Sequence, residues 1–208
     1  RGAAAAMYDV GARFGGFDAT LESELSAGSG LSSSAAFAVL MCRIFNGLYN
    51  NSELEPQAIA RIAQQAENLH FGKPCGLMDQ TACAVGGFIA IDFEDPAAPG
   101  IEKLDFDLRR MGYGLCIVDT GGNHADLNED YASVPAEMKA VAAAFGKPVL
   151  RETNEADVIN AIPTLRERLG DRAVLRALHF FAENRRVAAQ KAALKAGDIE
   201  GFFAGVLA

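Results

Sequence analysis

The sequence predicts an α/β protein made of two domains. In the first half of the chain, apolar runs of strand length stand between longer segments that carry a helical apolar stripe. Beyond about residue 110 the pattern is almost entirely helical, so we assign residues 1–110 and 111–208 to different domains. The chain has 208 residues, of which 50% are hydrophobic and 22% are charged, and it is therefore long enough to form a real core.

The first predicted elements run from the start of the chain to residue 69. Residues 3–12 are rich in alanine and predict the end of a helix. Residues 17–25 alternate between apolar and polar side chains, as a half-buried strand does. A helix is expected from Ser34 or Ala35 to about residue 49, because its apolar residues recur on one stripe. After a turn at residues 50–52, a second striped helix begins near Pro56 and ends at about residue 69.

The rest of the sequence continues the alternation of helix and strand patterns up to residue 119, and from residue 127 its patterns are helical. Residues 77–85 predict a short helix that ends at two glycines, followed by strands over residues 88–93 and 101–106. Residues 113–119 are almost continuously apolar, which predicts a strand at the centre of a sheet. Helical patterns cover the rest of the chain, over residues 127–145, 154–169 and 171–196.

A glycine-serine loop lies directly before the helix that starts near Ser34. Its glycines permit tight turns, and its serines place hydroxyl groups beside the free N–H groups of the helix start. Such a site suits an anion, although the loop lacks the Gly-Lys-Ser/Thr ending of a Walker A motif. A plain serine-capped helix is the alternative. The residues that would surround a phosphate group are Gly28, Ser29, Gly30, Leu31, Ser32, Ser33 and Ser34.

A second cluster holds two carboxylates on either side of a Lys-Pro turn. Asp79 lies at the start of a predicted helix, where it could accept a proton from a substrate hydroxyl or simply act as a helix N-cap. Glu67 lies near the end of a predicted helix, where the helix dipole disfavours a negative charge. This position indicates a nearby cation, with a plain surface glutamate as the alternative.

Two motifs together resemble those of the galactokinases, members of the superfamily that includes homoserine, mevalonate and phosphomevalonate kinases (the GHMP kinases). They are Gly-Leu-Ser-Ser-Ser-Ala-Ala at residues 30–36 and Lys-Pro-Cys-Gly-Leu-Met-Asp-Gln at residues 73–80. The resemblance implies the two-domain GHMP-kinase architecture, with the phosphate loop and the catalytic aspartate in the first domain. It also implies transfer of a phosphoryl group from ATP, with Mg²⁺, to the C1 hydroxyl of D-galactose.

The same resemblance implies a role for each matching residue. Asp79 is the catalytic aspartate and contacts the sugar. Glu67 binds Mg²⁺ together with a loop serine, Ser32 or Ser33. Gly76 and Tyr131 line the galactose site, although Tyr131 is followed by Ala-Ser-Val-Pro where the family usually has arginines.

Two family motifs are missing from these 208 residues. They are the sugar-binding Gly-Glu-His-Thr-Asp-Tyr, with the arginine before it, and the C-terminal Gly-Phe-Gly-Gly. We therefore expect an architecture that is incomplete at both ends and a chain that is inactive alone. The alternatives to galactokinase are an N-acetylgalactosamine or related sugar kinase and a non-catalytic regulator that binds galactose and ATP.

The composition of the chain indicates which classes of partner to expect. The net charge of −8 and the absence of a basic patch argue against nucleic acid. No apolar run reaches the roughly 20 residues of a membrane span. The four cysteines lack CxxC spacing, which suggests reduced thiols and a cytoplasmic location. We expect galactose and ATP as the small-molecule partners, and a monomer if the protein is complete.

Overall fold

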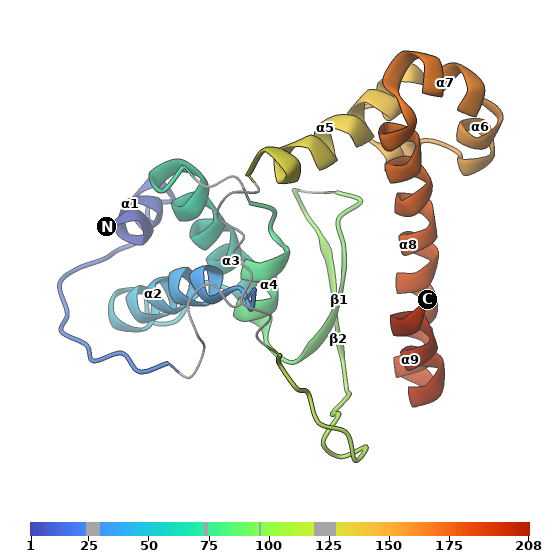
Figure 1. The fold of residues 1–208 in the computed structure, drawn as a ribbon. Helices are drawn as coiled ribbons and strands as arrows, with labels where there is room; N and C mark the ends of the chain where they lie inside the picture. The colour runs from blue at the N-terminus through green and yellow to red at the C-terminus, as the bar shows by residue number, and fades with distance from the viewer. Residues whose placement is uncertain (24–29, 73–74, 96, 119–127) are drawn as a thin grey trace. The chain divides into compact units, whose positions relative to one another are not determined.

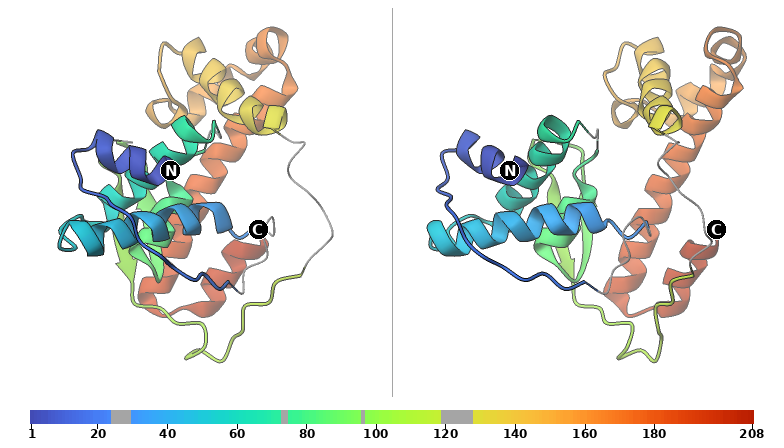
Figure 2. Two further views of the ribbon diagram at one scale, coloured as in Figure 1. Left: turned by 90° about the vertical axis from the view of Figure 1, so that its left-hand side faces the viewer. Right: turned by 60° about the vertical axis from the view of Figure 1, so that its left-hand side comes forward.

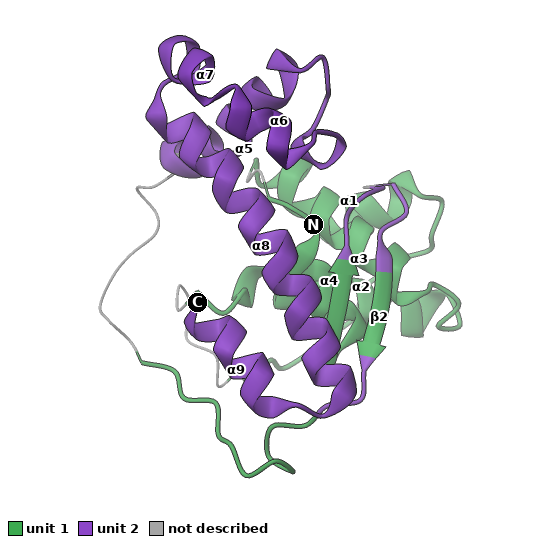
Figure 3. Cartoon of the chain, turned by 90° about the vertical axis from the view of Figure 1, so that its right-hand side faces the viewer, with its two compact units in different colours: residues 1–91, 101–103, 107–120 green, residues 92–100, 104–106, 121–208 purple. Residues whose placement is uncertain are grey.

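The structure, a computed structural model, describes residues 1–23, 30–72, 75–95, 97–118 and 128–208 (Figure 1). The chain divides into two compact units, coloured separately in Figure 3. The first unit contains residues 1–91, 101–103 and 107–120, and the second contains residues 92–100, 104–106 and 121–208. The domain limits expected at residues 110 and 111 stay a prediction.

The first unit is built from helices that pack on one another. Its helices are α1 (Gly2–Asp9), α2 (Ser33–Tyr49), α3 (Pro56–Gln65) and α4 (Met78–Val85). Helix α3 has its proline in the first turn, and it continues into a π-helical turn, η1 (Ala66–His70). Helix α2 packs against both α3 and α4. These helices confirm the predictions for residues 34–49, 56–69 and 77–85, and α1 confirms most of the helix predicted over residues 3–12.

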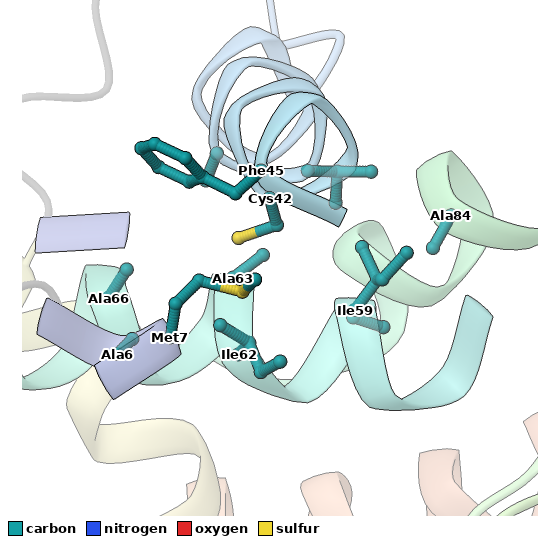
Figure 4. Packing of buried hydrophobic residues seen from close by; sticks show 12 residues of the cluster. Ala6, Met7, Cys42, Phe45, Ile59, Ile62, Ala63, Ala66 and Ala84 are labelled. Atoms are coloured by element: carbon teal, nitrogen blue, oxygen red, sulfur yellow. The ribbon is translucent and has the colours of Figure 1, made fainter. Parts of the chain in front are cut away.

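Small and medium side chains fill the core of the first unit. Alanines from α1, α3 and α4 let the helix backbones approach closely, and the larger side chains fill the space between them. In Figure 4 the side chain of Cys42 in α2 points toward Met7 and Ala63. The buried cluster consists of Ala6, Met7, Ala38, Val39, Cys42, Phe45, Ile59, Ala60, Ile62, Ala63, Ala66 and Ala84.

The strands β1 (Phe88–Asp92) and β2 (Gly100–Leu104) form a two-stranded sheet. Only a short loop joins them, and so short a connection permits only antiparallel pairing. The sheet confirms the strands predicted over residues 88–93 and 101–106 to within two residues at each end.

The second unit is helical apart from its share of the sheet. Its helices are α5 (Asn128–Ala144), α6 (Glu155–Asn160), α7 (Ile162–Leu169), α8 (Asp171–Ala196) and α9 (Ile199–Leu207), with a 3₁₀ turn η2 (Leu150–Glu152). Figures 1 and 2 show α9 folded back beside the C-terminal half of α8. Glu137 of α5 forms ion pairs with Arg172 and Arg176 of α8. The buried cluster of this unit is Val141, Ala142, Leu150, Val158, Leu165, Ala173, Val174 and Ala177.

The helix predicted over residues 154–169 is two helices in the structure. Asn154 caps α6 by accepting a hydrogen bond from the Ala156 N–H at 2.8 Å, and α6 ends at Asn160. A new helix, α7, then begins with a proline in its first turn. Because proline cannot continue a helical hydrogen-bond ladder, the chain breaks and restarts here.

Two strand predictions are wrong in the part of the chain that the structure describes. Residues 17–23 and 113–118 have no regular secondary structure, because β1 and β2 are the only described segments that pair as strands. Residues 13–16 are instead tied to the end of α2, where Asn50 exchanges hydrogen bonds with Arg13 and the Tyr49 hydroxyl donates to the Gly16 carbonyl. Leu115 and Val118 are 81% and 80% exposed, so this segment is not a buried central strand.

No helix in the described part of the chain has both the length and the apolar character that crossing a bilayer requires.

Candidate functional site

The described part of the glycine-serine loop has an unusual backbone at the start of α2. Gly30 and Ser32 both have left-handed conformations, with φ of 74° and 55°. A left-handed serine is uncommon and costs conformational energy, and such residues cluster at ligand sites. Ser32 is the N-cap of α2, yet its side chain makes no capping hydrogen bond. The start of a helix carries N–H groups without intrahelical partners and a partial positive charge, and both suit an anion.

Of the other five predicted loop residues, three are described by the structure. They are Leu31, Ser33 and Ser34, and Ser33 is the first residue of α2. Gly28 and Ser29 lie outside the described residues. Their predicted contact with phosphate stays a prediction.

Glu67 is a buried carboxylate rather than a surface one. It lies in the π-helical turn η1 and is only 4% exposed. Its Oε2 atom accepts a hydrogen bond from the side-chain amide of Gln80, and the Cys75 thiol lies 3.9 Å from the same oxygen. The alternative of a plain surface glutamate is thus wrong. Short π-helical segments inside α-helices occur frequently at functional sites.

Asp79 is the second residue of α4 and is half-buried. The N-cap of α4 is Leu77, so the alternative of Asp79 as a simple N-cap is also wrong. A carboxylate in the first turn is stabilised by the helix dipole while its oxygens remain available to a ligand.

The thiol of Cys83 lies within electrostatic range of both Asp79 and Glu67. Cys83 follows Asp79 by four residues on α4, so both side chains lie on one face of that helix. Burial raises the pKa of Cys83, and the negative charges of Asp79 and then Glu67 raise this pKa further. Both carboxylates are therefore close enough to one thiol to perturb it, although they come from different helices.

Hydrogen bonds hold the segment between the two carboxylates against the end of α3 and the turn η1. The Cys75 N–H donates to the Asn68 side-chain oxygen at 2.9 Å, and the Gln64 amide donates to the Cys75 carbonyl at 3.0 Å. Gly76, the next residue, is exposed, and a Cβ atom at this position would meet nothing within 4 Å. The backbone at Gly76 is therefore open to a ligand beside Asp79.

Four polar residues around Glu67 were not predicted from the sequence to belong to the site. Gln64, Asn68, Cys75 and Gln80 form the hydrogen-bond network around Glu67. Their only signal in the sequence is adjacency, since Asn68 follows Glu67 and Gln80 follows Asp79.

Tyr131, the third residue predicted to bind substrate, belongs to the second unit. It lies in the first turn of α5 and is 59% exposed. The structure brings Glu67, Gly76 and Asp79 together within the first unit. The role of Tyr131 stays a prediction.

The donor set is compatible with Mg²⁺ bound together with a nucleotide. Among the described residues no three His, Cys, Asp or Glu side chains gather as a metal cluster. Mg²⁺ in phosphoryl-transfer enzymes needs only one or two protein oxygens, because phosphates and water supply the other ligands. Glu67 offers such an oxygen ligand, and its carboxylate is held in place by Gln80.

Comparisons with known proteins agree with these motifs. Residues 1–87 match the family model described as the GHMP kinases N terminal domain. The chain is 36% identical over 198 residues to the galactokinase of Streptomyces coelicolor, covering 93% of this chain and 49% of that protein. It is 30% identical over 194 residues to the galactokinase of Pyrococcus furiosus, covering 93% and 52%. The chain spans about half the length of the curated relatives that it matches.

Proposed function

Because the chain belongs to the GHMP kinase family, we propose that it forms part of a galactokinase. The proposed reaction transfers the γ-phosphoryl group of MgATP to the C1 hydroxyl of D-galactose. The observation that carries this proposal is the pairing of Glu67 and Asp79, because Gln80, the residue after Asp79 on α4, donates a hydrogen bond to the buried Glu67 carboxylate. Similarity to galactokinases supports the choice of sugar.

Each part of the proposed site has a separate task. The loop Gly28–Ser34 and the start of α2 bind the nucleotide phosphates through N–H groups and hydroxyls. Glu67, with Ser32 or Ser33, holds Mg²⁺, which when bound neutralises charge on the phosphates. Gly76 and Tyr131 contact the sugar.

Asp79 acts on the sugar hydroxyl. The C1 oxygen forms a bond to the γ-phosphorus while the bond from that phosphorus to the ADP oxygen breaks, and the hydroxyl proton passes to the Asp79 carboxylate. Phosphoryl transfer depends mainly on positioning and electrostatics, so a carboxylate fixed on a helix next to the open Gly76 backbone suits this role.

The test is galactose-dependent release of ADP, assayed on the full-length gene product and on the 208-residue chain. We expect activity in the former and none in the latter. N-acetylgalactosamine offered in place of galactose distinguishes the related sugar kinases. Binding of galactose and ATP by the full-length product without any ADP release would contradict a catalytic role and favour a regulator.

The Asp79→Asn variant tests the catalytic assignment. We expect kcat to fall by about 10²–10⁴-fold, because the amide keeps the shape of the side chain but does not accept the proton. Asp157→Asn is the matched control, since Asp157 is an exposed aspartate in the first turn of α6. Near-normal turnover by Asp79→Asn would remove Asp79 from the mechanism.

A further inference from the structure

We propose that Gln80 is a positioning residue that holds the Glu67 carboxylate in the orientation required for metal binding. This inference rests on the proposed function, in which Glu67 binds Mg²⁺. Gln80 itself touches neither substrate nor metal in the proposal. It acts through the hydrogen bond that it donates to Glu67.

The contacts of Gln80 join the two parts of the candidate site. Its side-chain nitrogen donates to Glu67 Oε2 and lies 3.4 Å from the Cys75 sulfur. Gln80 follows Asp79 directly on α4, whereas Glu67 belongs to the π-turn after α3. One amide therefore links the helix that carries the proposed catalytic carboxylate to the carboxylate proposed to bind metal.

The orientation of the Gln80 amide follows from chemistry. An ionised carboxylate has only acceptor atoms, so the group that faces Glu67 Oε2 must be the NH₂ end of the amide. The hydrogen bond occupies one carboxylate oxygen and restricts rotation of the group. A metal ligand with a fixed orientation binds more tightly than one that must be ordered on binding.

Packing alone does not account for an amide at this position. The Gln80 side chain is 1% exposed, and its oxygen Oε1 has no hydrogen-bond partner among the described residues. A buried acceptor without a partner is destabilising, and an apolar side chain of the same length would avoid that penalty. The feature that an apolar residue could not replace is the hydrogen bond to Glu67.

The experiment measures metal binding directly, on the full-length gene product. Mn²⁺ replaces Mg²⁺ because it prefers similar oxygen ligands and its free form has an electron paramagnetic resonance signal. Mn²⁺ is titrated in the presence of ADP, so no turnover occurs. The variants are Gln80→Met, which keeps the length of the side chain but removes the donor, and Gln80→Asn, whose amide is too short to reach Glu67. Thermal melting without metal checks that each variant folds.

Gln65→Met is the matched control. Gln65 also donates a side-chain hydrogen bond to a carboxylate, that of Asp9 at 2.9 Å, in the same unit. The substitution therefore removes the same kind of contact at a different carboxylate. We expect its Mn²⁺ affinity to stay within about twofold of the wild type, whereas second-shell substitutions typically weaken metal binding by about 10–100-fold.

The expected result is a rise of about 10–100-fold in the apparent Mn²⁺ dissociation constant for both Gln80 variants. In a Glu67→Gln background, Gln80→Met should add no further loss, because Gln80 acts through Glu67. Wild-type affinity in a folded Gln80 variant, or losses that multiply in the double variant, would overturn the inference while leaving the proposed function standing. A wild-type protein that binds no Mn²⁺ with ADP would overturn the proposed function, and the inference would fall with it.

Discussion

At the scale of single residues, burial decides the chemistry of Cys42. Its side chain is fully buried among apolar groups of α1, α2 and α3. A thiolate would lose its hydration there without gaining a compensating charge, and burial raises the pKa of Cys42 to about 12, from an ordinary value of 9.0. Cys42 is therefore a small apolar core residue with an unreactive thiol.

This shift predicts a loss of stability in alkaline solution. The unfolded chain loses the Cys42 proton near pH 9, whereas the folded chain keeps it until about pH 12, so the stabilisation is complete below pH 9 and disappears as the pH rises to 12. The contribution lost is at most about 4 kcal/mol, from three pKa units. Denaturant unfolding between pH 8 and 11 should show a steeper decline for the wild type than for Cys42→Ala. Cys116→Ala, which removes an exposed thiol, is the control, and parallel curves for wild type and Cys42→Ala would contradict the prediction.

The sequence indicated the two carboxylates of the candidate site but not their surroundings. Asp79 and Glu67 stand in recognisable motifs, so both could be named from the sequence. The burial of Glu67 could not be foreseen, because it depends on the π-helical winding of residues 66–70, and apolar periodicity does not reveal that winding. The contacts of Gln80 and Cys75 depend on how α4 packs against α3, which a single sequence does not specify.

At the scale of elements, helix α2 supports α4 at both its side and its end. The two helices share the core of the first unit, and the Arg43 guanidinium of α2 donates to the Ala84 carbonyl in the last turn of α4. A cation at a helix C-terminus also interacts favourably with the helix dipole. Because α4 carries Asp79 and Gln80, this contact helps to hold the site.

Replacing either of two glycines, one inside α2 and one at the end of α4, by alanine should change the free energy of unfolding, in opposite directions. Gly47 lies inside α2 and a Cβ there would meet nothing within 4 Å, so Gly47→Ala should stabilise the protein by about 0.5–1 kcal/mol. Gly86 ends α4 with φ 71° and ψ 162°, a region open essentially to glycine alone, so Gly86→Ala should destabilise it by about 1–3 kcal/mol. Urea unfolding checks both. Equal effects of the same sign would mean that backbone conformation does not govern these positions.

The success of each element prediction depended on whether the element is defined locally. Helices such as α2 and α8 carry their stripe and their stop signals within their own sequences, and both were predicted. Residues 17–23 and 113–118 carry strand-like patterns, yet a strand also requires a neighbour to accept and donate its hydrogen bonds. Only β1 and β2 have such neighbours among the described residues, and they are joined by a short loop.

At the scale of the whole molecule, the described residues form two separate buried clusters. Ile59 lies in the core of the first unit and Leu165 in that of the second, and both are almost completely buried. Each core draws its buried residues from one unit only. Stability should therefore be divided between two units rather than shared throughout the chain.

Hydrogen exchange resolved by peptide tests this division. Ile59→Ala and Leu165→Ala should each destabilise their own unit by about 2–5 kcal/mol, because each leaves a cavity in a packed core. Ile59→Ala should speed amide exchange in α2, α3 and α4 while leaving α7 and α8 unchanged, and Leu165→Ala should do the reverse. If either variant speeds exchange in all of these helices, the two units unfold as one.

The π-turn after α3 also affects how this sequence should be aligned with its relatives. A regular α-helix rotates by about 100° for each residue, whereas a π-helical turn accommodates an additional residue in the same stretch of helix. A relative with an unbroken α-helix here would have to lack one residue to keep its glutamate facing the position of Gln80. We therefore expect a single-residue gap within the helix, near residues 66–70, wherever evolution has gained or lost this turn.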